Sequence, residues 1–118
     1  RGIKSLRALL HDPRQCRLHA VTIPTEMALA ETGDLVASAR RIGIEVSGLI
    51  LNQVAPPGSS EFERTLHESD AALVRKFNQR FPEMRPTLVY RRDEPIGLAR
   101  LLQLGELLFE PLAKARVA

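Results

Sequence analysis

Polar side chains follow two apolar runs of this sequence, and their types suit recognition of a planar ligand. Asn52 and Gln53 come directly after Val-Ser-Gly-Leu-Ile-Leu, and Tyr90 to Glu94 end a second run. An amide side chain presents one acceptor and a pair of donors in a plane, which matches the edge of a heterocycle such as adenine. The alternative is that Asn52 only caps a turn. Spacing alone leaves both interpretations open.

Charged residues near these positions have two interpretations as well. Arg91 and Arg92 could contact a phosphate or could simply solvate a turn. Glu26 and Glu31 lie near the start of an expected helix, where the helix dipole favours carboxylates without any ligand. Taken alone, these residues favour the solvated interpretation.

Several common reaction centres are absent from the sequence. His11, His19 and His67 are too widely spaced for a metal site or a nucleophile triad, and Cys16 is the only cysteine. Neither a Gly-x-x-x-x-Gly-Lys-Ser/Thr phosphate loop nor Gly-x-Gly-x-x-Gly occurs. We therefore assign no catalytic or metal-binding residue, and expect that this chain alone does not hydrolyse a nucleotide.

Apolar periodicity and proline or glycine breaks predict an α/β protein with the order α-β-α-β-α-β-α. The expected elements are a helix ending near His11, a strand from Leu18 to Ile23, a helix from Glu26 to about Arg41, a strand from Val46 to Leu51, a helix from Glu61 to about Phe81, a strand from Thr87 to Tyr90, and a helix capped by Asp93 that carries Leu98 to Phe109. Helical crossovers make the three strands parallel. The apolar positions of the strand from Leu18 to Ile23 imply that it is buried. The carboxyl ends of parallel strands meet at one sheet edge, where open α/β sheets bind ligands. Asn52 and Tyr90 should therefore lie close together.

Composition is that of an ordinary globular domain. The 118 residues are 44% hydrophobic, 26% charged and only 4% aromatic, so residues 1–118 suit one domain with a mostly aliphatic core. No apolar run approaches the roughly 20 residues that span a bilayer, and no signal peptide opens the chain, which favours a cytoplasmic protein. The net charge of +3 is spread among acidic residues, so we expect no nucleic-acid partner.

Five short motifs, in order and spacing, resemble the C-terminal half of the anion-transporting (ArsA-like) ATPases. This family includes the arsenite-pump ATPase and relatives that target tail-anchored membrane proteins. The motifs are Leu10-His11-Asp12-Pro13, Ile23-Pro24, Glu31-Thr32-x-x-Leu35, Leu51-Asn52-Gln53 and Glu94-Pro95-x-Gly97-Leu98. The resemblance covers about Leu9 to Phe109. It agrees with a start at Arg1 inside an apparent helix, which suggests a C-terminal fragment of a longer protein.

The resemblance implies part of a P-loop NTPase fold whose phosphate loop and magnesium ligands lie in a preceding segment. Asn52 of the Asn-Gln pair would contact adenine, and the backbone from Val89 to Arg92 would cover the base. The segment from Pro24 to Glu31 would approach the nucleotide across a homodimer. Implied ligands and partners are ATP with magnesium and a membrane transporter or membrane-protein cargo. The alternative is a non-catalytic α/β binding or regulatory module.

This chain departs from the family pattern in several places. Thr25 replaces the glutamate of a Pro-Glu pair, Gly33-Asp34 replaces a Glu-Arg pair, and Val89 replaces a proline before the adenine loop. The loop after Gln53 lacks the paired cysteines that bind zinc between subunits in targeting members. One structural expectation follows if the strands run outward in chain order. The strand from Leu18 to Ile23 then has an open edge, through which we expect the chain to self-associate.

Overall fold

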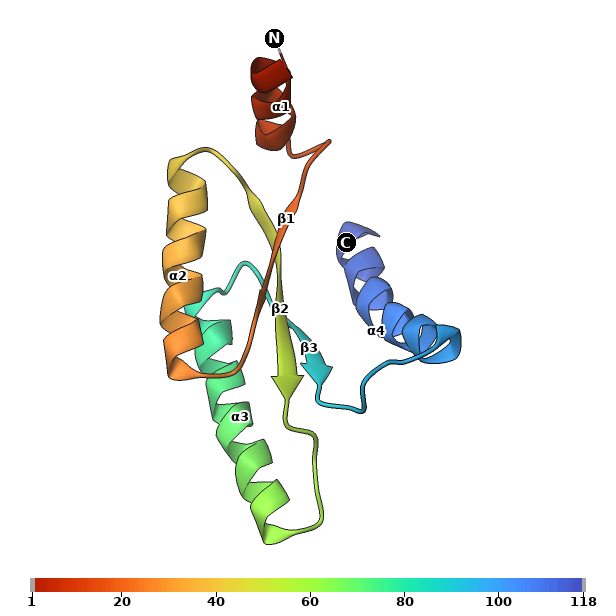
Figure 1. The fold of residues 1–118 in the computed structure, drawn as a ribbon. Coiled ribbons are helices and arrows are strands. Elements are labelled where there is room, and N and C mark those ends of the chain that lie inside the picture. Colours follow the sequence, from red (N-terminus) through yellow and green to blue (C-terminus); the bar gives the residue numbers. More distant parts are fainter. Residues whose placement is uncertain (1, 118) are drawn as a thin grey trace.

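The computed structural model describes residues 2–117, in which three strands alternate with four helices (Figure 1). The elements are α1 (Gly2–His11), β1 (Leu18–Thr22), α2 (Glu26–Arg41), β2 (Val46–Val54), α3 (Glu61–Arg80), β3 (Thr87–Tyr90) and α4 (Leu98–Val117). The strands are parallel in the order β1-β2-β3. The predicted α/β class, element order and strand direction are confirmed.

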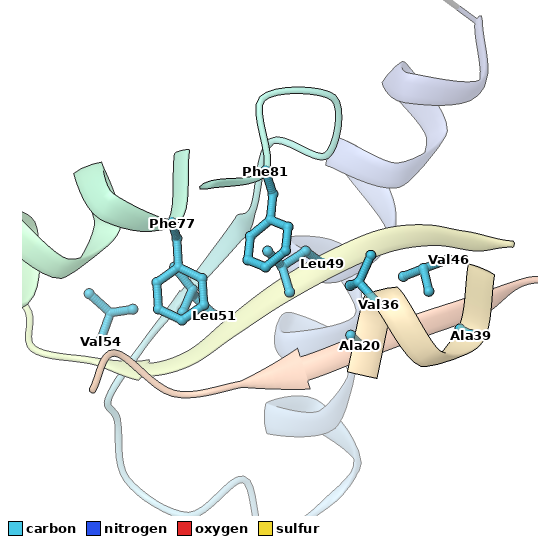
Figure 2. Packing of buried hydrophobic residues seen from close by; sticks show 9 residues of the cluster. All are labelled: Ala20, Val36, Ala39, Val46, Leu49, Leu51, Val54, Phe77 and Phe81. Carbon is cyan, nitrogen blue, oxygen red and sulfur yellow. The ribbon is translucent and has the colours of Figure 1, made fainter. Parts of the chain in front are cut away.

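The hydrophobic core lies between the sheet and the helices α2 and α3. Leu49 and Leu51 of the central strand β2 are 2% and 0% exposed, and Figure 2 shows them beneath the rings of Phe77 and Phe81. The two ring centroids are 6.2 Å apart with an interplanar angle of 33°. Smaller side chains complete the cluster, namely Ala20, Val36, Ala39, Val46 and Val54. The core is mostly aliphatic, as the composition predicts.

Local signals explain where α2 and α3 begin. Thr25 is the N-cap of α2 and accepts a hydrogen bond from the Ala28 amide at 3.0 Å. Ser60 and Glu63 form a capping box at the start of α3, in which each side chain accepts from the backbone of the other. Both starts match the sequence prediction.

Gly33 permits close packing between α2 and α3. A Cβ atom at this position would lie 3.0 Å from the guanidinium of Arg80, which itself stacks over the Phe81 ring at 5.3 Å. Glycine inside a helix costs stability, and here the missing side chain makes room for an arginine of the neighbouring helix.

The sheet is covered unevenly, and the predicted burial of β1 is wrong. Helices α2 and α3 pack on one side, whereas α4 packs on the other side against β3 (Figure 1). Ala20 is the only buried residue of β1, and Val21 is 64% exposed. Within the described residues β1 pairs only with β2, so its outer edge is open, as expected from chain-order strands.

Three element boundaries differ from the prediction. Strand β1 ends at Thr22, one residue before Ile23. Strand β2 continues through Asn52 and Gln53 to Val54 instead of ending at Leu51. Helix α4 begins at Leu98, so Asp93 is not its cap. The reason is local: Pro95 and Gly97, whose φ is 90°, hold the preceding segment in a non-helical path.

Candidate functional site

The end of β2 contains a β-bulge at Asn52 and Gln53. The β2–β3 register passes from the pair Leu51 and Leu88 to the pair Val54 and Tyr90, so β2 advances three residues while β3 advances two. Gln53 has a φ of 57°, the only positive value at a described residue other than glycine. A bulge with left-handed backbone redirects the neighbouring side chains away from the regular pleat. Asn52 therefore takes its direction from the bulge.

A pocket of about 500 Å³ lies beside this bulge, at the carboxyl edge of the sheet. Its volume falls in the range of small-molecule sites, roughly 300–1,000 Å³. The lining residues are Asn52, Gln53, Val89, Tyr90, Arg91, Arg92, Asp93, Pro95 and Leu104. Six of the seven candidate residues identified from the sequence are thus brought together in one pocket.

The lining combines an apolar surface with one planar polar group. Val89 is 9% exposed and Leu104 of α4 is half-buried. The Asn52 side chain is half-buried and forms no hydrogen bond to any described residue, so its donors and acceptor are available to a ligand. Such a site can hold a flat heterocycle by contact with its faces and by hydrogen bonds to its edge.

The rim of the pocket is basic. Arg91 and Arg92 are exposed, and Asp93 is the acidic residue among the lining side chains. The Arg91 amide donates to the Val54 carbonyl at 2.8 Å, and Arg92 Nε donates to the Tyr90 carbonyl at 3.4 Å. The Arg91 bond ties the segment after β3 to the end of β2, whereas the Arg92 bond is local to that segment. The Arg91 guanidinium has no partner among the described residues and can meet an anion.

Glu31, the seventh candidate residue, is exposed on α2 and does not line this pocket. Its neighbour Thr32 is buried and joins α2 to β1. The Thr32 hydroxyl donates to the Ala28 carbonyl at 2.6 Å and is hydrogen-bonded to the Thr22 hydroxyl at 3.0 Å. A contact from Glu31 to a nucleotide across a dimer stays a prediction.

Leu104 is a lining residue that the sequence did not reveal. Leucines are frequent along α4, and that pattern predicts burial without saying which leucine meets the strand ends. Only the path of the chain between β3 and α4 brings this position over Val89 and Asn52.

The described chain holds no cluster of metal-binding side chains. Its His, Cys, Asp and Glu side chains form no group of three or more that could hold a metal ion. None of the helices, as far as the structure describes them, is long and apolar enough to cross a membrane.

Comparison with known proteins decides the family. Residues 1–110 match the anion-transporting ATPases. The chain belongs to this family. One relative is ATPase GET3B of Arabidopsis thaliana, 41% identical over 56 residues that make up 48% of this chain and 14% of the relative. Another is the putative arsenical pump-driving ATPase 2 of Aquifex aeolicus (strain VF5), 28% identical over 91 residues, which cover 75% of this chain and 30% of the relative.

Membership of the anion-transporting ATPases confirms the family resemblance seen in the motifs, and an ATPase family implies nucleotide binding. This family membership favours the ATPase interpretation of the sequence over the alternative of a non-catalytic regulatory module. The chain spans less than a third of the length of either of these relatives.

Proposed function

We propose that the pocket between the ends of β2 and β3 binds the adenine base of ATP. The observation that carries the proposal is the meeting of a free planar amide, an apolar surface and two arginines in one pocket of about 500 Å³. The family supplies the ligand class, because an ATPase must bind a nucleotide.

Each part of the pocket has a role in this proposal. Asn52 exchanges hydrogen bonds with the edge of the base, which offers a donor and an acceptor side by side. Val89 and Leu104 contact its faces, and the backbone from Val89 to Arg92 covers it. Arg91 and Arg92 at the rim attract the phosphates without enclosing them.

The phosphate chemistry is the part of the proposal that this chain does not supply. Its sequence has no phosphate loop, so we expect weak ATP binding and no hydrolysis by residues 1–118 alone. We propose that they form the C-terminal domain of a longer ATPase, as the partial coverage of both relatives supports. There, preceding residues hold the phosphates and magnesium.

We propose that the complete protein is a cytoplasmic homodimeric ATPase that serves anion transport or membrane-protein targeting. Its partner is then a membrane transporter or a membrane-protein cargo. The names of the relatives, one a putative arsenical pump-driving ATPase and the other a GET3B ATPase, support these two alternatives. In such a dimer the exposed Glu31 reaches the nucleotide of the other subunit.

Nuclear magnetic resonance (NMR) titration with adenosine tests the base pocket, because it detects millimolar binding. The Asn52 side-chain amide and the backbone amides of residues 89–92 should shift together. Asn52→Ala should weaken binding by about fivefold or more, since it removes both hydrogen-bonding groups. Gln79→Ala is the matched control, because it removes an exposed amide of α3 outside the pocket.

Two results would contradict these proposals. Adenosine-dependent shifts confined to other surfaces, or equal losses in both variants, would refute the base pocket. Micromolar ATP affinity of this chain by titration calorimetry would refute the statement that the phosphates are held elsewhere.

We also propose that copies of this chain associate through the open edge of β1. No described residue pairs with the outer edge of β1, and Leu18, Val21 and Ile23 are 36%, 64% and 41% exposed. Sedimentation should reveal a dimer that Val21→Lys weakens, while Ser69→Lys on the exposed surface of α3 leaves it intact. A clean monomer of the unmodified chain at high concentration would refute this association.

A further inference from the structure

Two side chains of α3 hold both backbone groups of Ala55, the residue that follows β2. The Ala55 amide donates to Asp70 Oδ2 at 2.8 Å, and its carbonyl accepts from His67 Nδ1 at 2.8 Å. Ala55 is 2% exposed and Asp70 is 8% exposed. Residues three apart lie on the same side of a helix, so His67 and Asp70 reach the same peptide from one surface of α3. We call these two side chains the α3 clamp.

The burial of the Asp70 side chain lowers stability unless hydrogen bonds compensate for it. A carboxylate removed from water loses its hydration and needs strong hydrogen bonds in return. Within the described residues Asp70 forms no ion pair, and its side chain accepts a hydrogen bond from the Ala55 amide. A charged acceptor makes a stronger bond to an amide than a neutral one does. The buried charge is therefore used to fix the backbone at the end of β2.

Ala55, the residue that the α3 clamp holds, follows Gln53 of the bulge by two positions. Gln53 keeps a left-handed backbone that residues other than glycine seldom adopt. Such a conformation persists only where the surrounding contacts impose it. On the β3 side, Val54 is held by the Arg91 amide at 2.8 Å, and on the α3 side, Ala55 is held by the clamp. The bulge is thus anchored from two directions just after Gln53.

We propose that His67 and Asp70 are positioning residues for the base pocket, because they fix the bulge that directs Asn52. This inference rests on the proposed adenine site for its functional consequence. Neither side chain lines the pocket, so both act through the backbone of residues 53–55. The clamp also makes the position of Asn52 depend on α3, a helix that packs on the opposite side of the sheet from the pocket residue Leu104.

Two variants of the whole chain, Asp70→Ala and Asp70→Asn, test whether Asp70 positions Asn52. Asp70→Ala leaves the Ala55 amide without a partner, and its hydrogen exchange should accelerate by about 5- to 100-fold. The Asn52 side-chain resonances should shift without any nucleotide present, and adenosine affinity should fall by about fivefold or more. Asp70→Asn keeps an acceptor oxygen and should restore most of all three properties. Glu68→Ala, at an exposed position of α3, is the control and should change none of them.

His67→Ala is the second variant and decides the question if Asp70→Ala does not fold. It removes the half-buried partner of the Ala55 carbonyl and should shift the Asn52 resonances in the same direction.

Faster exchange at Ala55 with unchanged Asn52 resonances and unchanged adenosine affinity would overturn the positioning role while leaving the adenine site intact. Failure of the unmodified chain to bind adenosine would refute the adenine site instead. The nucleotide-free resonances would then still decide whether the α3 clamp directs Asn52.

Discussion

Replacing Gln53 by glycine tests whether the bulge at the end of β2 stores backbone strain. An L-residue in the left-handed region costs about 1–2 kcal/mol, and glycine does not pay this cost. The Gln53→Gly variant, however, loses more conformational entropy on folding than the unmodified chain, which costs about 0.5–1 kcal/mol. The Gln53 side chain is exposed and forms no hydrogen bond to a described residue, so its removal adds little. The difference is a net stabilisation of about 0.75 kcal/mol at the middle of these ranges, and of about 0 to 1.5 kcal/mol at their limits.

The same strand provides a control variant whose expected change in stability has the opposite sign. Ser47 is also an exposed residue of β2, and its φ is not positive. Ser47→Gly therefore gains no relief of strain and should destabilise the chain by about 0.5–1 kcal/mol. Gln53→Val should destabilise it as well, because a β-branched residue in the left-handed region is a strong outlier.

Urea denaturation followed by circular dichroism measures all three variants. The slope of unfolding free energy against urea should stay constant, so that a shift of the midpoint reports stability alone. Equal destabilisation by Gln53→Gly and Ser47→Gly would refute the reasoning, because it would mean that Gln53 carries no strain that glycine can release.

Three further changes test the packing around the sheet. Phe77→Ala removes a fully buried ring and should cost about 3–5 kcal/mol, a large share of the stability of a small domain, in the same urea assay. Ser60→Ala removes half of the capping box of α3 and should cost about 0.5–2 kcal/mol, whereas Ser60→Asp, which keeps an acceptor, should cost less. Gly33→Ala should lower the melting temperature despite the better helix propensity of alanine, since its Cβ would press on Arg80, and a rise would show that Arg80 simply moves away.

The sequence predicted the elements because their signals are local. Proline, glycine and helix-capping residues mark the ends of the helices, and the length of each apolar run distinguishes a strand from a helix. Parallel pairing followed from the helical crossovers, and so did the meeting of Asn52 with the residues after β3.

The same local signals did not predict which apolar residues are buried, because burial depends on which element packs against them. The apolar residues of β1 predicted burial, yet α4 packs against β3 and leaves Val21 exposed. Leu104 could not be distinguished from the other leucines of α4 before the path of the chain was known.

By itself, then, the amino-acid sequence determined the order of the elements, the family motifs and the sheet edge that collects Asn52, Tyr90 and Arg91. Only the tertiary structure decided how Asn52 is held. The bulge depends on a shift of register between two strands, and the α3 clamp joins residues 12 and 15 positions apart in the chain. Neither feature has a local pattern, because both arise from backbone hydrogen-bonding groups that find their partners only when α3 packs against the sheet.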